Sequence, residues 1–114
     1  MSATCRTTGC KLSVPKEITE EQLCVLHFTL RLEQMCAEFR RETVMGNAGH
    51  ERQVEIIRFI ANQGELLARV ATGGMHMADE IKARVLSTFL TLMNLRESLD
   101  RAAMRVPPGR TAQR

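Results

Sequence analysis

Apolar residues recur at spacings of three and four along most of this chain, which is the pattern of amphipathic α-helices. Thr19 and Gln22 have the spacing of a capping box, and Ile18 and Leu23 that of a hydrophobic staple. We therefore expect a first helix to begin at Thr19 and to end at the glycines of residues 46–49. Its apolar stripe consists of Val25, Phe28, Leu32, Met35 and Phe39.

The same periodicity predicts two further helices, over residues 50–72 and 77–105. Gly73-Gly74 ends the first of them and Pro107-Pro108-Gly109 the second. The later helix keeps a regular apolar stripe with one polar exception, Thr88. The earlier helix carries small residues beside its apolar face, which allow a neighbouring helix to come close: Ala61, Gly64, Ala68 and Ala71.

These elements predict an all-α fold, a three-helix antiparallel bundle with long helices and an N-terminal zinc-stabilised loop. The helices must alternate in direction because the connections between them are short. A chain of 114 residues fits one small domain. We divide it into an N-terminal cysteine-containing loop (1–18), the bundle (19–106) and a disordered tail (107–114).

Composition and charge narrow the classes of function. The net charge is +3, and Trp and Tyr are absent. The basic residues form no stripe with interleaved aromatic rings, so nucleic-acid binding is not favoured. The longest uncharged apolar stretch, residues 85–95, is too short to span a bilayer, and residues 1–14 contain no apolar signal segment. We expect no membrane association and a cytoplasmic location, where thiols stay reduced.

Four metal-ligating residues fall into two pairs at the start of the chain. Cys5 and Cys10 are separated by four residues, and Cys24 and His27 by two. Three thiolates and an imidazole are a standard tetrahedral ligand set for Zn²⁺. Gly9 permits a tight turn before Cys10, and residues three apart on a helix face the same side.

This segment resembles the short Cys3His zinc units of small bacterial and phage proteins, in which a Gly-Cys knuckle precedes Leu-Cys-x-x-His-aromatic on a helix. The resemblance covers residues 5–28 and implies that Cys5, Cys10, Cys24 and His27 hold a structural Zn²⁺. The alternative is a disordered N-terminus, in which Cys24 is a small buried residue and His27 a solvated one.

The helical wheel places His27 about 120° from the centre of the first apolar stripe, so this histidine is not a core residue. A second apolar patch lies on its side of the helix: Leu23, Leu26 and Leu30. We expect the N-terminal loop to cover that patch with Leu12, Val14 and Ile18.

Other candidate residues are more isolated. His76 lies in a loop at the same end as Cys24, where it would join or replace His27 at the metal, or remain in solvent. Cys36 falls beside the apolar stripe and is expected in the core. No catalytic triad, phosphate loop or Glu-x-x-His pair is present, so we expect no enzymatic activity.

The last helix has more apolar surface than its stripe requires, and on the middle helix Phe59 and Leu66 lie off the expected core face. The surplus residues of the last helix are Leu86, Phe89, Leu90 and Met93. Monomers rarely expose such a patch, so we expect it to bind a second copy or a partner helix.

The sequence therefore favours a non-enzymatic helical interaction or oligomerisation module with a structural zinc site. Two alternatives remain open. One is a nucleic-acid-binding regulator that contacts phosphates with Arg6, Lys11 and Lys16. The other is a thiol/zinc redox sensor, in which oxidation of Cys5 and Cys10 releases the metal.

Overall fold

The structure, a computed structural model, describes residues 4–46, 48–74 and 76–105. Its elements in chain order are a 3-10 helix, an α-helix that continues into a π-helical turn, and two more α-helices: η1 (Lys16–Glu21), α1 (Val25–Arg40), η2 (Arg41–Met45), α2 (His50–Thr72) and α3 (Asp79–Arg105). Within the described residues no strand forms, apart from one isolated bridge between Thr4 and Ser13. The all-α class is confirmed, whereas the predicted tail at 107–114 lies outside the described residues.

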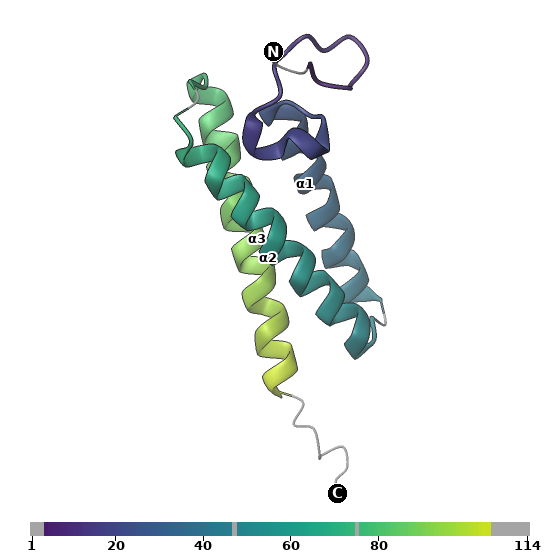
Figure 1. The fold of residues 1–114 in the computed structure, drawn as a ribbon. Coiled ribbons are helices and arrows are strands. Elements are labelled where there is room, and N and C mark those ends of the chain that lie inside the picture. The colour runs from purple at the N-terminus through teal and green to yellow at the C-terminus, as the bar shows by residue number, and fades with distance from the viewer. Residues whose placement is uncertain (1–3, 47, 75, 106–114) are drawn as a thin grey trace, which may run out of the picture.

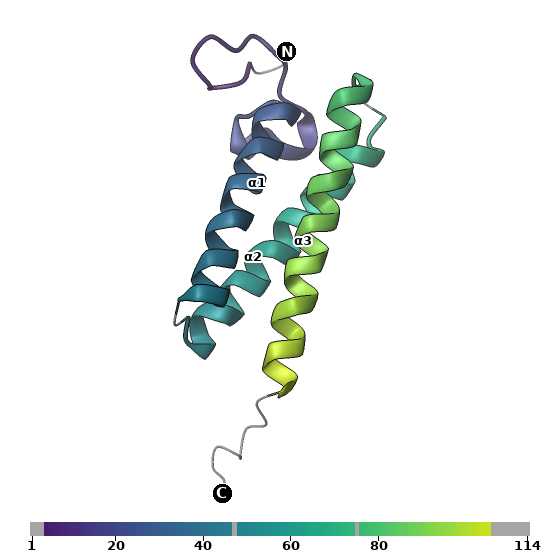
Figure 2. The same ribbon diagram turned by 180° about the vertical axis from the view of Figure 1, so that it is seen from behind.

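The chain reverses direction twice (Figure 1). Here α1 runs away from the N-terminal end of the molecule, α2 returns towards it, and α3 runs away again, as the view from behind also shows (Figure 2). α3 contacts both α1 and α2, and η1 packs against α2. The most deeply buried large side chains come from all of these elements: Ile18, Phe28, Leu32, Ile56, Ile60, Leu67 and Leu92.

The first long helix begins later than the sequence predicts. The Thr19 hydroxyl donates to the Lys16 carbonyl at 2.9 Å, and Gln22 adopts a left-handed conformation with φ of 59°, so no capping box forms. Instead Cys24 is the N-cap of α1, and its sulfur accepts a hydrogen bond from the backbone N–H of His27. The prediction of a start at Thr19 was wrong because a sulfur replaced the usual oxygen cap.

The end of the first helix is a π-helical turn rather than a simple glycine stop. Gly46 N–H donates to the Arg41 carbonyl at 3.1 Å, across five residues. A Cβ atom at Gly46 would lie 2.7 Å from the carbonyl oxygen of Glu42, so this position requires glycine. The Arg52 guanidinium then binds the Glu42 carboxylate and ties the start of α2 to this turn.

Helix α2 matches the predicted range of 50–72, and it approaches α3 closely at Gly64. A Cβ atom there would meet Cε of Met93 at 3.2 Å, which is the close contact that the small residues predict. Helix α3 begins two residues later than predicted, after Met77, whose side chain is buried.

The polar exception in the stripe of α3 has a partner on α1. Thr88 is 2% exposed, and its hydroxyl donates to Oε2 of Glu33 at 3.1 Å. Arg84 binds the same carboxylate through two nitrogens at 2.8 and 2.9 Å. A carboxylate with three donors holds α1 and α3 in register, because only one alignment of the two helices satisfies them all.

The surplus apolar residues divide into two groups. Phe89 and Met93 are partly buried against the core, whereas Leu86 and Leu90 are 60% and 54% exposed. Phe59 of α2 also packs inside, with its ring edge-on to Phe39 at a centroid distance of 5.5 Å. The sequence placed Phe59 off the core face, and that was wrong because α1 ends beside this part of α2.

Candidate metal centre

The first two candidate ligands lie on a hairpin-like loop. Cys5 N–H donates to the Leu12 carbonyl at 3.0 Å, and Cys10 N–H donates to the Thr7 carbonyl at 3.0 Å. Gly9 has φ of +82°, which fits the third position of a type II turn. The predicted tight turn before Cys10 is therefore present, and it brings the two cysteines back to the same side.

The second pair lies at the N-terminus of α1, and backbone hydrogen bonding holds the loop against it. Arg6 N–H donates to the Gln22 carbonyl at 2.8 Å, two residues before Cys24. The left-handed conformation of Gln22 turns that carbonyl towards the loop while the chain enters α1. Because Cys24 is the N-cap, its side chain and that of His27 project together over the first turn.

The four donor atoms lie within 4.8 Å of one another. Nδ1 of His27 is 3.2 Å from Sγ of Cys24 and 3.4 Å from Sγ of Cys5, and the sulfurs of Cys10 and Cys24 are 3.9 Å apart. Tetrahedral Zn²⁺ with ordinary bond lengths would separate two sulfurs by about 3.8 Å and sulfur from nitrogen by about 3.6 Å. These three separations lie within about 0.4 Å of the edges of such a tetrahedron, and the four residues lie close enough to hold a metal ion.

Disulfide bonding does not account for the cluster. All four cysteines of the chain are free, and 3.9 Å between the sulfurs of Cys10 and Cys24 is far from the roughly 2 Å of a disulfide. Cys5 and Cys24 are both buried. Buried sulfurs this close together, beside an imidazole nitrogen, form an arrangement of donors that one cation would satisfy.

The electrostatics of the cluster also limit how many thiolates it carries. Burial raises the pKa of the Cys5 thiol, but hydrogen bonds with Thr7 and with the backbone of Cys24 outweigh that effect and lower the pKa to about 6. Burial raises the pKa of Cys24 to about 11, and the neighbouring sulfurs of Cys10 and Cys5 add to the rise. The cluster therefore accommodates one thiolate, and a second would be repelled by the first. Ionisation of all three cysteines requires a positive charge among their sulfurs.

Two of the three residues expected to cover the second apolar patch of α1 are buried. Val14 and Ile18 belong to the core cluster, as does Leu23 of the patch, although η1, which carries Ile18, packs against α2. Leu12 is 49% exposed, so the prediction that it covers the patch was wrong.

The remaining sequence candidates lie elsewhere. His76 is exposed and is not part of the group of donor atoms, so His27 supplies the nitrogen of this cluster. Cys36 is buried in the core of α1, and burial raises its pKa, as expected for a packing residue. The sequence did not indicate the capping role of Cys24, since cysteine is not among the usual N-cap residues.

Comparison with known proteins gives no relative: no protein family, no curated protein and no solved structure matches this chain. In the part of the chain that the structure describes, no helix has the length and apolar character to cross a membrane.

Proposed function

We propose that this protein is a non-enzymatic helical interaction module, a three-helix antiparallel bundle whose N-terminal loop is fastened by a structural Zn²⁺. Cys5, Cys10, Cys24 and His27 would hold the ion, as the resemblance to Cys3His zinc units implies. The convergence of these four donors within 4.8 Å carries the proposal. Four protein ligands leave no open position for water or substrate, which favours a structural role over a catalytic one.

The role of the metal would be to join two segments of the chain. Two ligands come from the loop and two from the start of α1. Without the ion, the loop keeps its hydrogen bonds and the burial of Cys5, Val14, Pro15 and Ile18. A metal that binds only the folded arrangement stabilises it in proportion to its affinity.

The interaction surface would be the exposed part of α3. Leu86 and Leu90 lie one helical turn apart and are among the few large apolar side chains exposed in the described chain. Phe89 and Met93 form the partly buried base of the same patch. We propose that a second copy or a partner helix covers it, because burial of such residues drives association.

Metal analysis of the purified protein tests the zinc site. We expect one zinc per chain, and its loss in a Cys24→Ser variant. Cys36→Ala is the matched control, since Cys36 is buried on the same helix but lies outside the cluster. Absence of zinc from the wild-type protein, or equal loss in the two variants, would contradict the site.

Light scattering at micromolar concentration tests the surface separately. We expect a dimer, converted to monomer by combined Leu86→Gln and Leu90→Gln substitutions. Leu12→Gln, which alters an exposed leucine on the N-terminal loop, is the control and should remain dimeric. If the wild-type protein is a monomer, the pairing proposal is contradicted and the zinc proposal is unaffected. A salt-dependent shift of random duplex DNA would instead favour the regulator alternative.

A further inference from the structure

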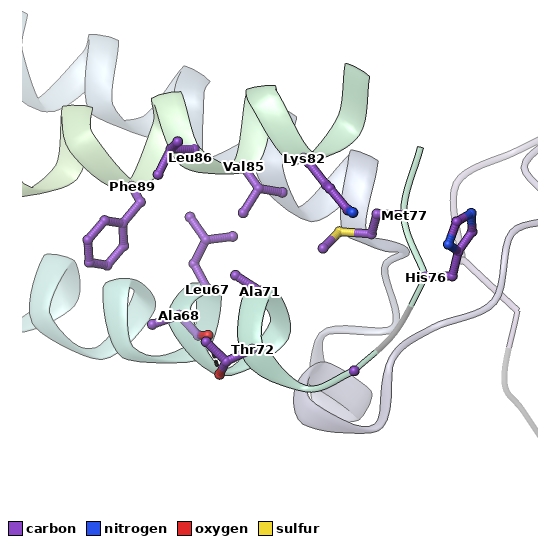
Figure 3. Close-up of a pocket in the computed structure, with 11 residues that line it drawn as sticks. Leu67, Ala68, Ala71, Thr72, His76, Met77, Lys82, Val85, Leu86 and Phe89 are labelled. Atoms are coloured by element: carbon purple, nitrogen blue, oxygen red, sulfur yellow. Dashed lines mark hydrogen bonds between the residues drawn. The ribbon is translucent and has the colours of Figure 1, made fainter. Parts of the chain in front are cut away.

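A groove of about 620 Å³ lies between α2 and α3, at the end where the loop connects them. Figure 3 shows Leu67 and Ala71 of α2 facing Val85 and Phe89 of α3 across it. Its volume falls in the range of small-molecule sites, and its walls are mainly apolar, as is typical of them. The metal cluster does not contribute to it.

The polar groups of the groove gather at the loop end. Lys82 and His76 line it there, and no carboxylate is among the lining residues (Figure 3). Within the described residues, Lys82 takes part in no salt bridge, although seven are formed elsewhere. The groove therefore combines a long apolar wall with one free ammonium group at its end.

We propose that this groove binds a single-chain aliphatic carboxylate, with its hydrocarbon tail along Ala68, Ala71 and Phe89 and its carboxylate at Lys82. An alkyl chain suits walls that are apolar apart from Thr72, whose hydroxyl already donates to the Ala68 carbonyl at 2.9 Å, because burial of the chain removes apolar surface from water on both partners. An anionic head suits this ammonium group, which forms no salt bridge with the described residues. The site takes no residue from the metal cluster, but it shares Leu86 and Phe89 with the surface proposed for pairing.

A second copy of the chain would fill this groove less completely than an aliphatic carboxylate. The large apolar side chains exposed in the described chain are Leu12, Leu86 and Leu90. Leu86 already forms part of the groove wall, and a single inserted leucine would leave most of about 620 Å³ unfilled. A flexible chain of methylene groups fills such a space by adapting its torsion angles.

Calorimetric titration of the full-length protein with octanoate, octanol and acetate tests the proposal. We expect octanoate to bind more tightly than octanol, which has the same tail without the charge, and acetate to show no binding. In Lys82→Gln the advantage of octanoate over octanol should fall by up to roughly fivefold, the upper end of the range for an exposed ion pair. Lys16→Gln removes an exposed lysine of η1 that does not line the groove, and it should leave the advantage of octanoate unchanged.

A second variant tests the apolar wall. Ala71→Phe places a ring in the groove and should abolish binding of both octanoate and octanol, while circular dichroism and zinc content stay as in the wild type. Absence of octanoate binding to the wild type, equal affinity for octanoate and octanol, or equal effects of Lys82→Gln and Lys16→Gln would overturn the proposal. Loss of dimers in Ala71→Phe, without octanoate binding to the wild type, would assign the groove to a second copy instead.

Discussion

The N-terminal segment, residues 4–24, and the interface between α2 and α3 are stabilised in different ways. The segment contributes six buried side chains (Cys5, Val14, Pro15, Ile18, Leu23 and Cys24). It is joined to α1 by the ion pair of Glu21 with Arg31 at 2.6 Å and by the donor cluster. The α2–α3 interface is apolar packing that opens into the groove at its loop end and is close at Gly64, where a Cβ atom would meet Cε of Met93 at 3.2 Å. The stability of the first therefore depends on specific atoms, and that of the second on buried area and fit.

Removal of the metal should separate the two regions most strongly. With free Zn²⁺ a thousandfold above Kd, binding adds about 4 kcal/mol to the segment. Chelation should therefore lower the hydrogen-exchange protection of the amides of Cys5 and Arg6 by up to about a thousandfold. Both amides donate hydrogen bonds within the segment or to Gln22. Amides in the middle of α2 are the internal control and should keep their protection; a uniform loss would mean that the regions are one unit.

A cavity in the core should destabilise the α2–α3 packing and leave the donor cluster unchanged. Ile60 is 0% exposed on α2, so Ile60→Ala should reduce the free energy of unfolding by about 2–5 kcal/mol. Urea denaturation followed by circular dichroism measures this loss. The folded variant should still hold one zinc per chain, because the cluster receives no ligand from α2. Loss of zinc at low urea would contradict the separation.

The close approach at Gly64 offers a finer test of fit. Gly64→Val should cost about 1–3 kcal/mol, because the added methyl groups would displace Met93. Gly64→Ala is the matched control and should be near neutral: helix propensity favours alanine by up to about 1 kcal/mol, while its Cβ meets the flexible end of Met93 at 3.2 Å. If both variants were equally stable, the two helices would have room to move apart.

Acidification should produce the smallest effect, at the contact between α1 and α3. The hydrogen bond from Arg84 lowers the pKa of Glu33 below its ordinary value of 4.5, and Thr88 adds to the shift. A lowered pKa in the folded state means that this stabilisation is complete above about pH 4.5 and declines as the pH falls below it. Comparison of wild type with Glu33→Gln should show a stability difference that shrinks in that acidic range. A stability difference that grows at acidic pH would contradict a lowered pKa of Glu33 in the folded state.

Sequence reasoning identified the helices more reliably than their ends. The range 50–72 was correct because glycines border it on both sides and its apolar period is unbroken. The start of α1 was missed because Thr19 and Gln22 form a good local capping signal, yet Gln22 is needed in a left-handed conformation for its carbonyl to meet Arg6. That requirement comes from Arg6, sixteen positions earlier in the sequence, and capping rules consider only neighbouring residues.

For the candidate site too, the sequence predicted one part and only the tertiary structure showed the other. Spacing and residue type alone selected Cys5, Cys10, Cys24 and His27, because metal chemistry requires particular donors at short separations. Only the tertiary structure distinguished His27 from His76, since both histidines lie at the same end of the molecule and the choice depends on which ring reaches the sulfurs. It also determined which apolar residues remain exposed. Leu86 and Phe89 look alike in the periodic pattern, but α2 covers Phe89 and leaves Leu86 outside, because exposure depends on the path of the neighbouring helix.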